Sequence, residues 1–77
     1  MSKSLHSEAW KRLLSGLIAA REDAGVTQIE LGQRLNRTQS FISKVERGER
    51  RLDVVEFCEW ARLLGYQPDE LIVRVKL

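Results

Sequence analysis

Cysteine and proline are almost absent from this sequence, and it contains no long apolar run. Cys58 is the only cysteine among 77 residues, so the chain alone cannot form an intrachain disulfide or a cysteine-based metal site. No apolar segment approaches the roughly 18 residues that a membrane span requires, and the N-terminus lacks the apolar stretch of a signal peptide. We therefore expect a cytoplasmic protein without metal, cofactor or membrane partner.

The length and composition favour one small folded domain. Hydrophobic residues make up 43% of the chain and charged residues 31%, as in ordinary globular proteins. A chain of 77 residues has room for one modest core and not for a further catalytic or ligand-binding domain, so no small-molecule ligand is expected. We expect a single domain over residues 1–77 with its core in 8–72, while residues 1–6 and 73–77 form flexible or dimer-forming tails.

Positive charge is concentrated in the middle of the chain. The total of +2 is too small to indicate a partner, but residues 34–51 hold six basic and two acidic residues, a net charge of +4. Residues 1–33 are neutral overall, and residues 52–77 hold three basic and five acidic residues. One central segment is therefore the candidate for binding an anionic partner.

Apolar spacing and capping residues predict five helices. Apolar residues recur at i, i+3, i+4 and i+7, polar residues that cap helices precede these stripes, and glycine or asparagine follows them. The predicted helices are about Ser7–Ala24, Gln28–Leu35, Gln39–Arg47, Asp53–Gly65 and Pro68–Ile72. The fold class is thus all-α, a compact bundle of five short helices. The tail from Ile72 to Leu77 partly alternates apolar and charged residues, which fits either a strand or a frayed end.

Several apolar side chains are predicted to form the core. Trp10 and Trp60 both stand at helical spacing with other apolar residues. In the fourth helix, the buried stripe is expected to be Val54, Phe57, Ala61 and Leu64.

The second and third predicted helices are joined by so few residues that they must cross steeply. Close crossing requires a small side chain, which Gly32 supplies, and asparagine at position 36 tolerates the positive φ of a tight turn. This pattern is typical of a helix-turn-helix, whose second helix projects its N-terminal residues into the major groove of DNA.

The residue types on and around this projecting helix suit DNA. Glutamine can bond N6 and N7 of adenine, hydroxyl groups can donate or accept, and an aromatic edge can pack on a thymine methyl. Predicted base-contacting residues are Thr38, Gln39, Ser40, Phe41, Ser43 and Lys44. Predicted phosphate-contacting residues are Thr27, Gln28, Arg37, Arg47, Arg50 and Arg51.

Each of these assignments has an alternative without DNA. The polar residues of the third helix are also compatible with a helix face that only contacts solvent. The basic residues are also compatible with a solvated surface on which they form ion pairs with Glu46 and Glu49. For Phe41, core packing and base contact are equal alternatives.

The run VTQIELGQRLNRTQSFISKVERG, from Val26 to Gly48, resembles the DNA-binding core of the lambda repressor and Cro family, also called XRE-type. The similarity extends through the fourth helix to Leu71. It implies a lambda-repressor-like fold of bacterial or phage type, with Gln28 on backbone phosphate and Gln39, Ser40 and Ser43 facing bases. Two residues depart from the family pattern: Gly32 replaces the usual alanine, and Asn36 stands where glycine is frequent.

These observations predict a transcriptional regulator, most simply a repressor, that binds a palindromic operator in double-stranded DNA as a homodimer. Because one recognition helix makes only a few base contacts, two are expected to bind about one turn of DNA apart. The last helix and the tail from Gln67 to Leu77 are the expected dimer surface. The alternative is an antitoxin or adaptor that uses the fold for protein binding. Enzymatic activity is not expected, because no catalytic constellation is present.

Overall fold

The structure is a computed structural model that describes residues 7–77 of the chain. Within these residues it contains five helices and no strand, which confirms the predicted all-α class. The predicted tail over residues 1–6 lies outside the described part. None of the helices in residues 7–77 is long and apolar enough to cross a membrane. The helices are α1 (Glu8–Asp23), α2 (Gln28–Arg34), α3 (Gln39–Glu46), α4 (Val54–Leu63) and α5 (Pro68–Val75).

Polar side chains begin the first four helices as the sequence predicts. Ser7, Thr27, Thr38 and Asp53 each accept a hydrogen bond from the backbone N–H three residues on. At α2 and α4 a glutamate at the third helical position returns the bond, which completes a capping box. These local bonds satisfy N–H groups that the first helical turn leaves unpaired, so the helix starts are determined by a few adjacent residues.

All five helices contribute side chains to the core, and Trp60 is its largest fully buried side chain. Trp10 is also buried, so both tryptophans are core residues as predicted. The prediction for Val54 is wrong, because its side chain is 78% exposed. Val54 is the first residue of α4 and lies at the rim of the core, where it borders an open apolar groove instead of a packed neighbour.

The C-terminal segment is neither a strand nor a frayed end. Helix α5 continues to Val75, and Lys76 then takes a left-handed conformation with φ of 61°. Val75 is buried against Gly16 of α1, so closely that a Cβ on Gly16 would lie 2.0 Å from Val75 Cγ1. The physical reason for the longer helix is thus a tertiary contact. Leu71 and Val75, four residues apart, form the buried stripe of α5.

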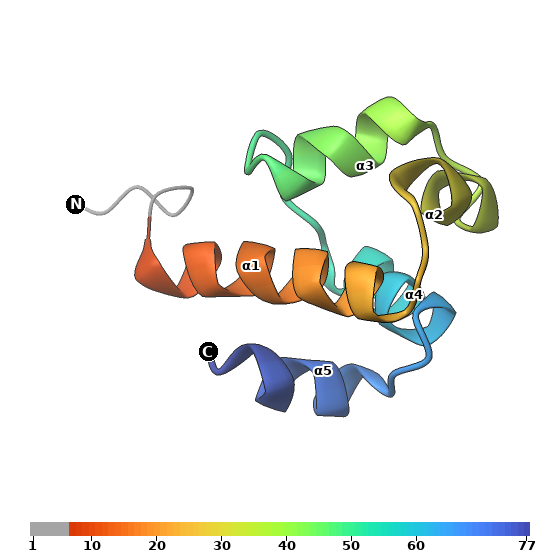
Figure 1. Ribbon diagram of the computed structural model, residues 1–77. Coiled ribbons are helices and arrows are strands. Elements are labelled where there is room, and N and C mark those ends of the chain that lie inside the picture. Colours follow the sequence, from red (N-terminus) through yellow and green to blue (C-terminus); the bar gives the residue numbers. More distant parts are fainter. Residues whose placement is uncertain (1–6) are drawn as a thin grey trace.

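The five helices form layers around α1 (Figure 1). Helices α2 and α3 pack together on one side of α1, and α5 runs along the other side. Helix α3 therefore lies at one edge of the molecule, held from beneath by α1.

Candidate nucleic-acid interface

The turn between α2 and α3 has the geometry that the sequence predicts. Asn36 adopts a φ of 58°, and the next N–H, of Arg37, donates a 2.7 Å hydrogen bond to the carbonyl of Gly32. A Cβ on Gly32 would lie 3.1 Å from the Arg37 and Thr38 carbonyl oxygens. Glycine thus lets α2 approach the turn closely, and the chain reverses sharply enough for α3 to project from the fold.

Helix α3 divides into a buried and an open face. Ile42 and Val45 are fully buried in the core. The open face carries polar residues: Thr38, Gln39, Ser40 and Lys44 are exposed, and Ser43 is half-buried. The Ser43 hydroxyl accepts a hydrogen bond from the Arg47 guanidinium one turn later. The polar start of α3 is therefore accessible from outside, as a groove-reading helix requires.

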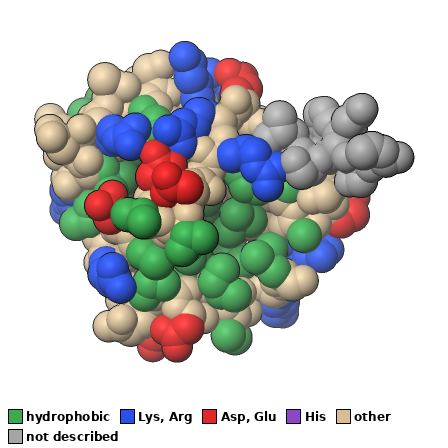
Figure 2. Space-filling view, turned by 180° about the vertical axis from the view of Figure 1, so that it is seen from behind, with side chains coloured by type: hydrophobic (Ala, Val, Ile, Leu, Met, Phe, Trp, Pro, Cys, Tyr) green, Lys and Arg blue, Asp and Glu red, His purple; other side chains and the backbone are tan. Residues whose placement is uncertain are grey.

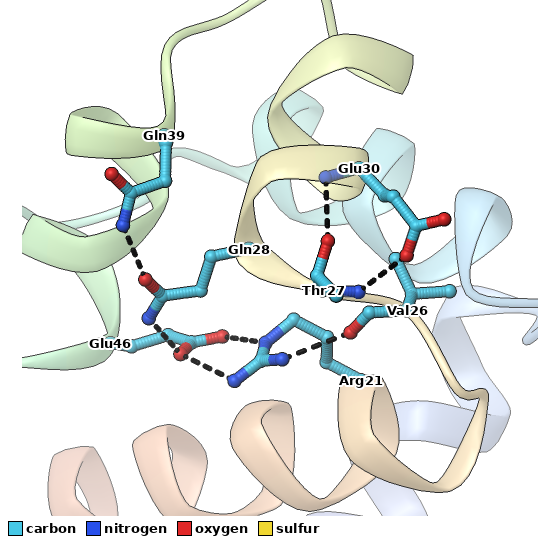
Figure 3. A network of polar contacts seen from close by, with 7 residues as sticks. All are labelled: Arg21, Val26, Thr27, Gln28, Glu30, Gln39 and Glu46. Atoms are coloured by element: carbon cyan, nitrogen blue, oxygen red, sulfur yellow. Dashed lines mark hydrogen bonds and ion pairs between the residues drawn. The ribbon is translucent and has the colours of Figure 1, made fainter.

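A chain of polar contacts that the sequence analysis did not predict supports this helix (Figure 3). Arg21 of α1 donates to both carboxylate oxygens of Glu46, with Nε–Oε2 and Nη2–Oε1 distances of 2.7 and 3.1 Å. Its third nitrogen, Nη1, donates to the carbonyl of Val26 at 2.9 Å. Gln28 Nε2 donates to Glu46 Oε1 at 2.8 Å, and Gln39 Nε2 donates to Gln28 Oε1 at 2.7 Å. The contacts connect the end of α1 to the first residue of α3.

The carboxylate of Glu46 determines the orientation of both glutamine amides. An ionised carboxylate only accepts hydrogen bonds, so Gln28 must turn its Nε2 towards Glu46 and its oxygen towards Gln39. Gln39 must then donate from Nε2. This leaves Gln39 Oε1 and its second Nε2 hydrogen for another partner, and together they form one acceptor and one donor side by side.

The ion pair that anchors this network is largely, but not wholly, buried. The Arg21 and Glu46 side chains are 12% and 4% exposed, and the Glu46 carboxylate, by accepting hydrogen bonds, raises the pKa of Arg21 above its ordinary value. Helical periodicity gives a signal for both residues. Arg21 follows the buried Leu17 by four positions, and Glu46 follows Ile42 by four, so each lies on the inward face of its helix.

Two residues predicted to contact phosphate stand at the start of α2. The Thr27 hydroxyl accepts from the Glu30 N–H at 3.0 Å in the capping box. Gln28 is half-buried, and its amide is engaged by Glu46 and Gln39 as described. Both side chains thus have structural roles within the fold, and their contact with phosphate stays a prediction.

Among the residues predicted to contact phosphate, Arg37, Arg47 and Arg50 form ion pairs with acidic groups of the fold. Arg47 forms an exposed ion pair with Glu49, in agreement with the alternative of a surface laced with that residue. Arg37 and Arg50 instead converge on Glu56 of α4, which the sequence analysis did not identify.

Arg51 lies on a different neighbour, with its guanidinium carbon 4.9 Å from the centre of the Trp10 ring. A cation at this distance from an aromatic face is attracted to it and stays close to the α1 side of the loop. Arg51 thus contacts α1 through the Trp10 ring.

Phe41 is the exception among the predicted base-contacting residues. Its ring is half-buried against the core and lies 6.3 Å from the Trp60 ring, centroid to centroid. The guanidinium carbons of Arg37 and Arg50 lie 4.3 and 4.8 Å from its centre. The structure therefore favours core packing for Phe41, where it also supports two arginines through cation–π contact.

Comparison with known proteins agrees with this geometry. A helix-turn-helix family model matches residues 17–71, which is more than half of the chain. The chain belongs to the helix-turn-helix family. This helix-turn-helix domain is 45% identical to an XRE-family like protein from Pseudomonas syringae pv. tomato, whose structure matches with a TM-score of 0.85 over 95% of this chain and 89% of that one.

More distant structures share the fold of the helix-turn-helix domain. Two structures of the clp gene regulator ClgR from Corynebacterium glutamicum are 22% identical and match with a TM-score of 0.80. They cover 90% of this chain, and 73% and 88% of their own chains are matched. No curated protein sequence matches the chain significantly.

Family membership establishes the class of function. The XRE-type helix-turn-helix family consists of DNA-binding transcriptional regulators that are not enzymes. The family predicted from the run Val26 to Gly48 is thus confirmed. The helix-turn-helix domain is a DNA-binding regulator.

Proposed function

We propose that the helix-turn-helix domain is a repressor that reads a palindromic operator as a homodimer. In this function α3 enters the major groove and its polar start contacts base edges. The observation that carries the proposal is the exposed Gln39 side chain at the first position of α3, held by Gln28 and, through it, by the buried ion pair. A regulator bound to an operator excludes other proteins from the same DNA, and for this reason we propose repression.

The base that Gln39 would read follows from its remaining hydrogen-bonding groups. Oε1 can accept from N6 of adenine while the second Nε2 hydrogen donates to N7, which is the bidentate pairing that distinguishes adenine in the major groove. Ser40, Ser43 and Lys44 lie on the same open face and are proposed to contact neighbouring bases. Thr38, the N-cap of α3, is proposed to contact the adjacent edge.

Phosphate contacts are proposed for the residues that surround α3. Arg37 and Arg50 lie beside Phe41, near the start of α3, and Arg47 follows the last residue of α3. Arg51, Thr27 and Gln28 complete the proposed set. Such contacts fix the orientation of the protein on the duplex and account for most sequence-independent affinity.

An exposed apolar surface supports the proposed homodimer. Val54 and Val55 of α4 and Ile72 and Val73 of α5 are exposed, and an apolar groove that Phe57 helps to line separates the two helices. Figure 2 shows hydrophobic side chains gathered on this side of the molecule, with charged groups around them. We propose that a second copy of the chain covers this surface, which includes the predicted helix from Gln67 onwards.

The same apolar surface is the one observation that favours the alternative, an antitoxin or adaptor that holds a different protein. The two functions differ in their dependence on DNA. A regulator binds duplex DNA with an affinity that falls steeply with salt, because each neutralised phosphate releases counterions.

Selection of bound duplexes from a random pool tests the proposal. We expect a palindromic motif that contains adenine in each half-site, with half-sites about one helical turn apart. Sedimentation of the complex should give two chains per duplex. Recovery of no common motif, together with salt-insensitive binding, would favour the protein-binding alternative, and a single unpaired half-site with one chain bound would contradict the dimer.

A further inference from the structure

Glu56 of α4 lies at the centre of a charged cluster beside the recognition helix. Its carboxylate accepts two hydrogen bonds from Arg50, with Nη1–Oε1 and Nη2–Oε2 distances of 2.6 and 3.0 Å. It also accepts one from Arg37 Nη2 at 2.9 Å and one from the Asp53 backbone N–H at 2.9 Å. Four donors thus surround one carboxylate whose side chain is only 14% exposed.

The two arginines are held a second time by Phe41. Their guanidinium carbons lie within 5 Å of the centre of its ring, and the ring itself packs against the buried Trp60. Phe41 belongs to α3, only two residues after Gln39. The positions of Arg37 and Arg50 are therefore fixed relative to the residue proposed to read adenine.

The restraint leaves both arginines accessible. Their side chains remain 42% and 40% exposed, and Glu56 engages three of the ten N–H donors that two guanidinium groups carry. A phosphate can thus bind Arg37 or Arg50 in place, without breaking the contacts to Glu56. While Glu56 and Phe41 hold them, the two guanidinium groups cannot move to reach a phosphate in a different position.

We propose that Glu56 is a specificity-determining residue that restrains Arg37 and Arg50 so that they meet phosphates only when α3 is seated in its operator. This inference rests on the proposed DNA-reading role of α3. Non-specific binding depends almost wholly on phosphate contacts made in many registers, and long mobile arginine side chains can reach the phosphates in each of them. Restrained arginines match the phosphate positions of one register only. The neighbouring carboxylate also weakens the positive electrostatic field that attracts random DNA.

The Arg47–Glu49 pair provides a matched comparison. It lies in the same loop region and has the same charges, but its residues are two apart in sequence and both side chains are 55% exposed. Arg47 donates to both oxygens of Glu49 and to the Ser43 hydroxyl, but in the described part of the chain it does not share its carboxylate with a second arginine or stack on an aromatic ring as Arg37 and Arg50 do. E49Q and E56Q remove the same unit of negative charge, but E49Q leaves Arg47 bonded to Ser43, whereas E56Q loosens two arginines at once.

The test compares binding of two probes by wild type, E56Q, E56D and E49Q. The probes are a random-sequence 20-bp duplex and the duplex recovered by selection, each titrated across a series of salt concentrations. For E56Q we expect random-duplex affinity to rise about fivefold, with a steeper salt dependence from the released arginines, and operator affinity to change little. For E49Q we expect similar increases on both probes, so that the ratio between them is unchanged.

The E56D variant separates restraint from net charge and also serves if E56Q fails to fold. Aspartate keeps the charge and still suits the first turn of a helix, but its side chain is one methylene shorter and cannot bond both arginines at once. The affinity ratio between operator and random duplex should fall severalfold in E56D although net charge is unchanged. If the wild type binds DNA but the ratio of operator affinity to random-duplex affinity is the same in wild type, E56D and E56Q, this inference is overturned and the proposed function is not. Absence of wild-type binding to either duplex would overturn the proposed function and the inference with it.

Discussion

The guanidinium of Arg21, near the end of α1, forms a bidentate ion pair with the carboxylate of Glu46, the last residue of α3. The two N–O distances are 2.7 and 3.1 Å. The pair joins two helices whose residues are 25 positions apart in sequence. Because Glu46 also orients Gln28, one contact both fastens α3 to the fold and sets the direction of its first side chain, Gln39.

Removing one partner of this pair is expected to be costly. In Glu46→Ala the buried Arg21 charge loses its carboxylate, and such a loss typically destabilises a protein by about 3–5 kcal/mol. Urea unfolding followed by circular dichroism measures the change. Replacing both residues by apolar ones, Arg21→Met with Glu46→Leu, should cost less than Glu46→Ala alone. A double variant less stable than the single one would contradict this account of the pair.

Gln28 is expected to act on base reading through Gln39. In Gln28→Ala the Gln39 amide loses the partner that orients it, so preference for adenine at the cognate position should fall by about 1–3 kcal/mol, the usual contribution of a bidentate base contact. Competition binding with operators that carry each of the four bases at that position measures the preference. Gln33→Ala, which removes an exposed amide from the same helix, is the control and should leave the preference intact.

The close contact between α1 and α5 predicts a strong effect at Gly16. A methyl group added there would overlap Val75, so Gly16→Ala should destabilise the fold by about 1–3 kcal/mol despite alanine's better helix propensity. Thermal unfolding measures this cost. Ser15→Ala, an exposed change on the same helix, is the control and should have almost no effect. A fully stable Gly16→Ala would mean that α5 is not docked as described.

Glu56 predicts how stability depends on pH. The hydrogen bonds from Arg50 and then from the Asp53 N–H lower the pKa of Glu56 from 4.5 to about 2. Since the pKa is lower in the folded chain, ionised Glu56 stabilises the fold above about pH 4.5, and this stabilisation disappears as the pH falls towards 2.

The expected loss of unfolding free energy is roughly 3 kcal/mol, because the pKa falls from 4.5 to about 2 and each pKa unit corresponds to about 1.4 kcal/mol. Unfolding at pH 5, 4, 3 and 2 should therefore show a smaller decline in E56Q than in wild type. Glu59→Gln, an exposed change on the same helix, should retain the wild-type decline. Equal declines in wild type and E56Q would contradict the assigned ionisation.

The helices and the turn were predictable because their causes are local. A cap such as Thr38, a turn residue such as Asn36 and an apolar stripe each act within a few residues. The same information predicted the exposed polar start of α3. The end of α5 was missed, because its helix depends on the packing of Val75 on Gly16, and the local alternation of residues suggested a strand or a frayed end.

The support of the candidate site was not predictable in the same way. Arg21 and Glu46, like Arg50 and Glu56, read singly as surface charges, and only the fold brings them together. Their helical positions gave a usable signal for Arg21 and Glu46, since both follow buried residues by four. No local pattern connected Arg37 with Glu56, because they are 19 residues apart, one in the turn before α3 and the other in α4.

The central claim is that Gln39, at the start of α3, reads an adenine in the major groove. The most direct test is the affinity of wild type and Gln39→Ala for the selected operator, with each adenine replaced in turn by 7-deazaadenine, which lacks the N7 acceptor. The account predicts that one replacement in each half-site weakens wild-type binding by roughly 1–3 kcal/mol and leaves Gln39→Ala almost unaffected. Equal losses in both proteins, or no loss at any adenine, would contradict it.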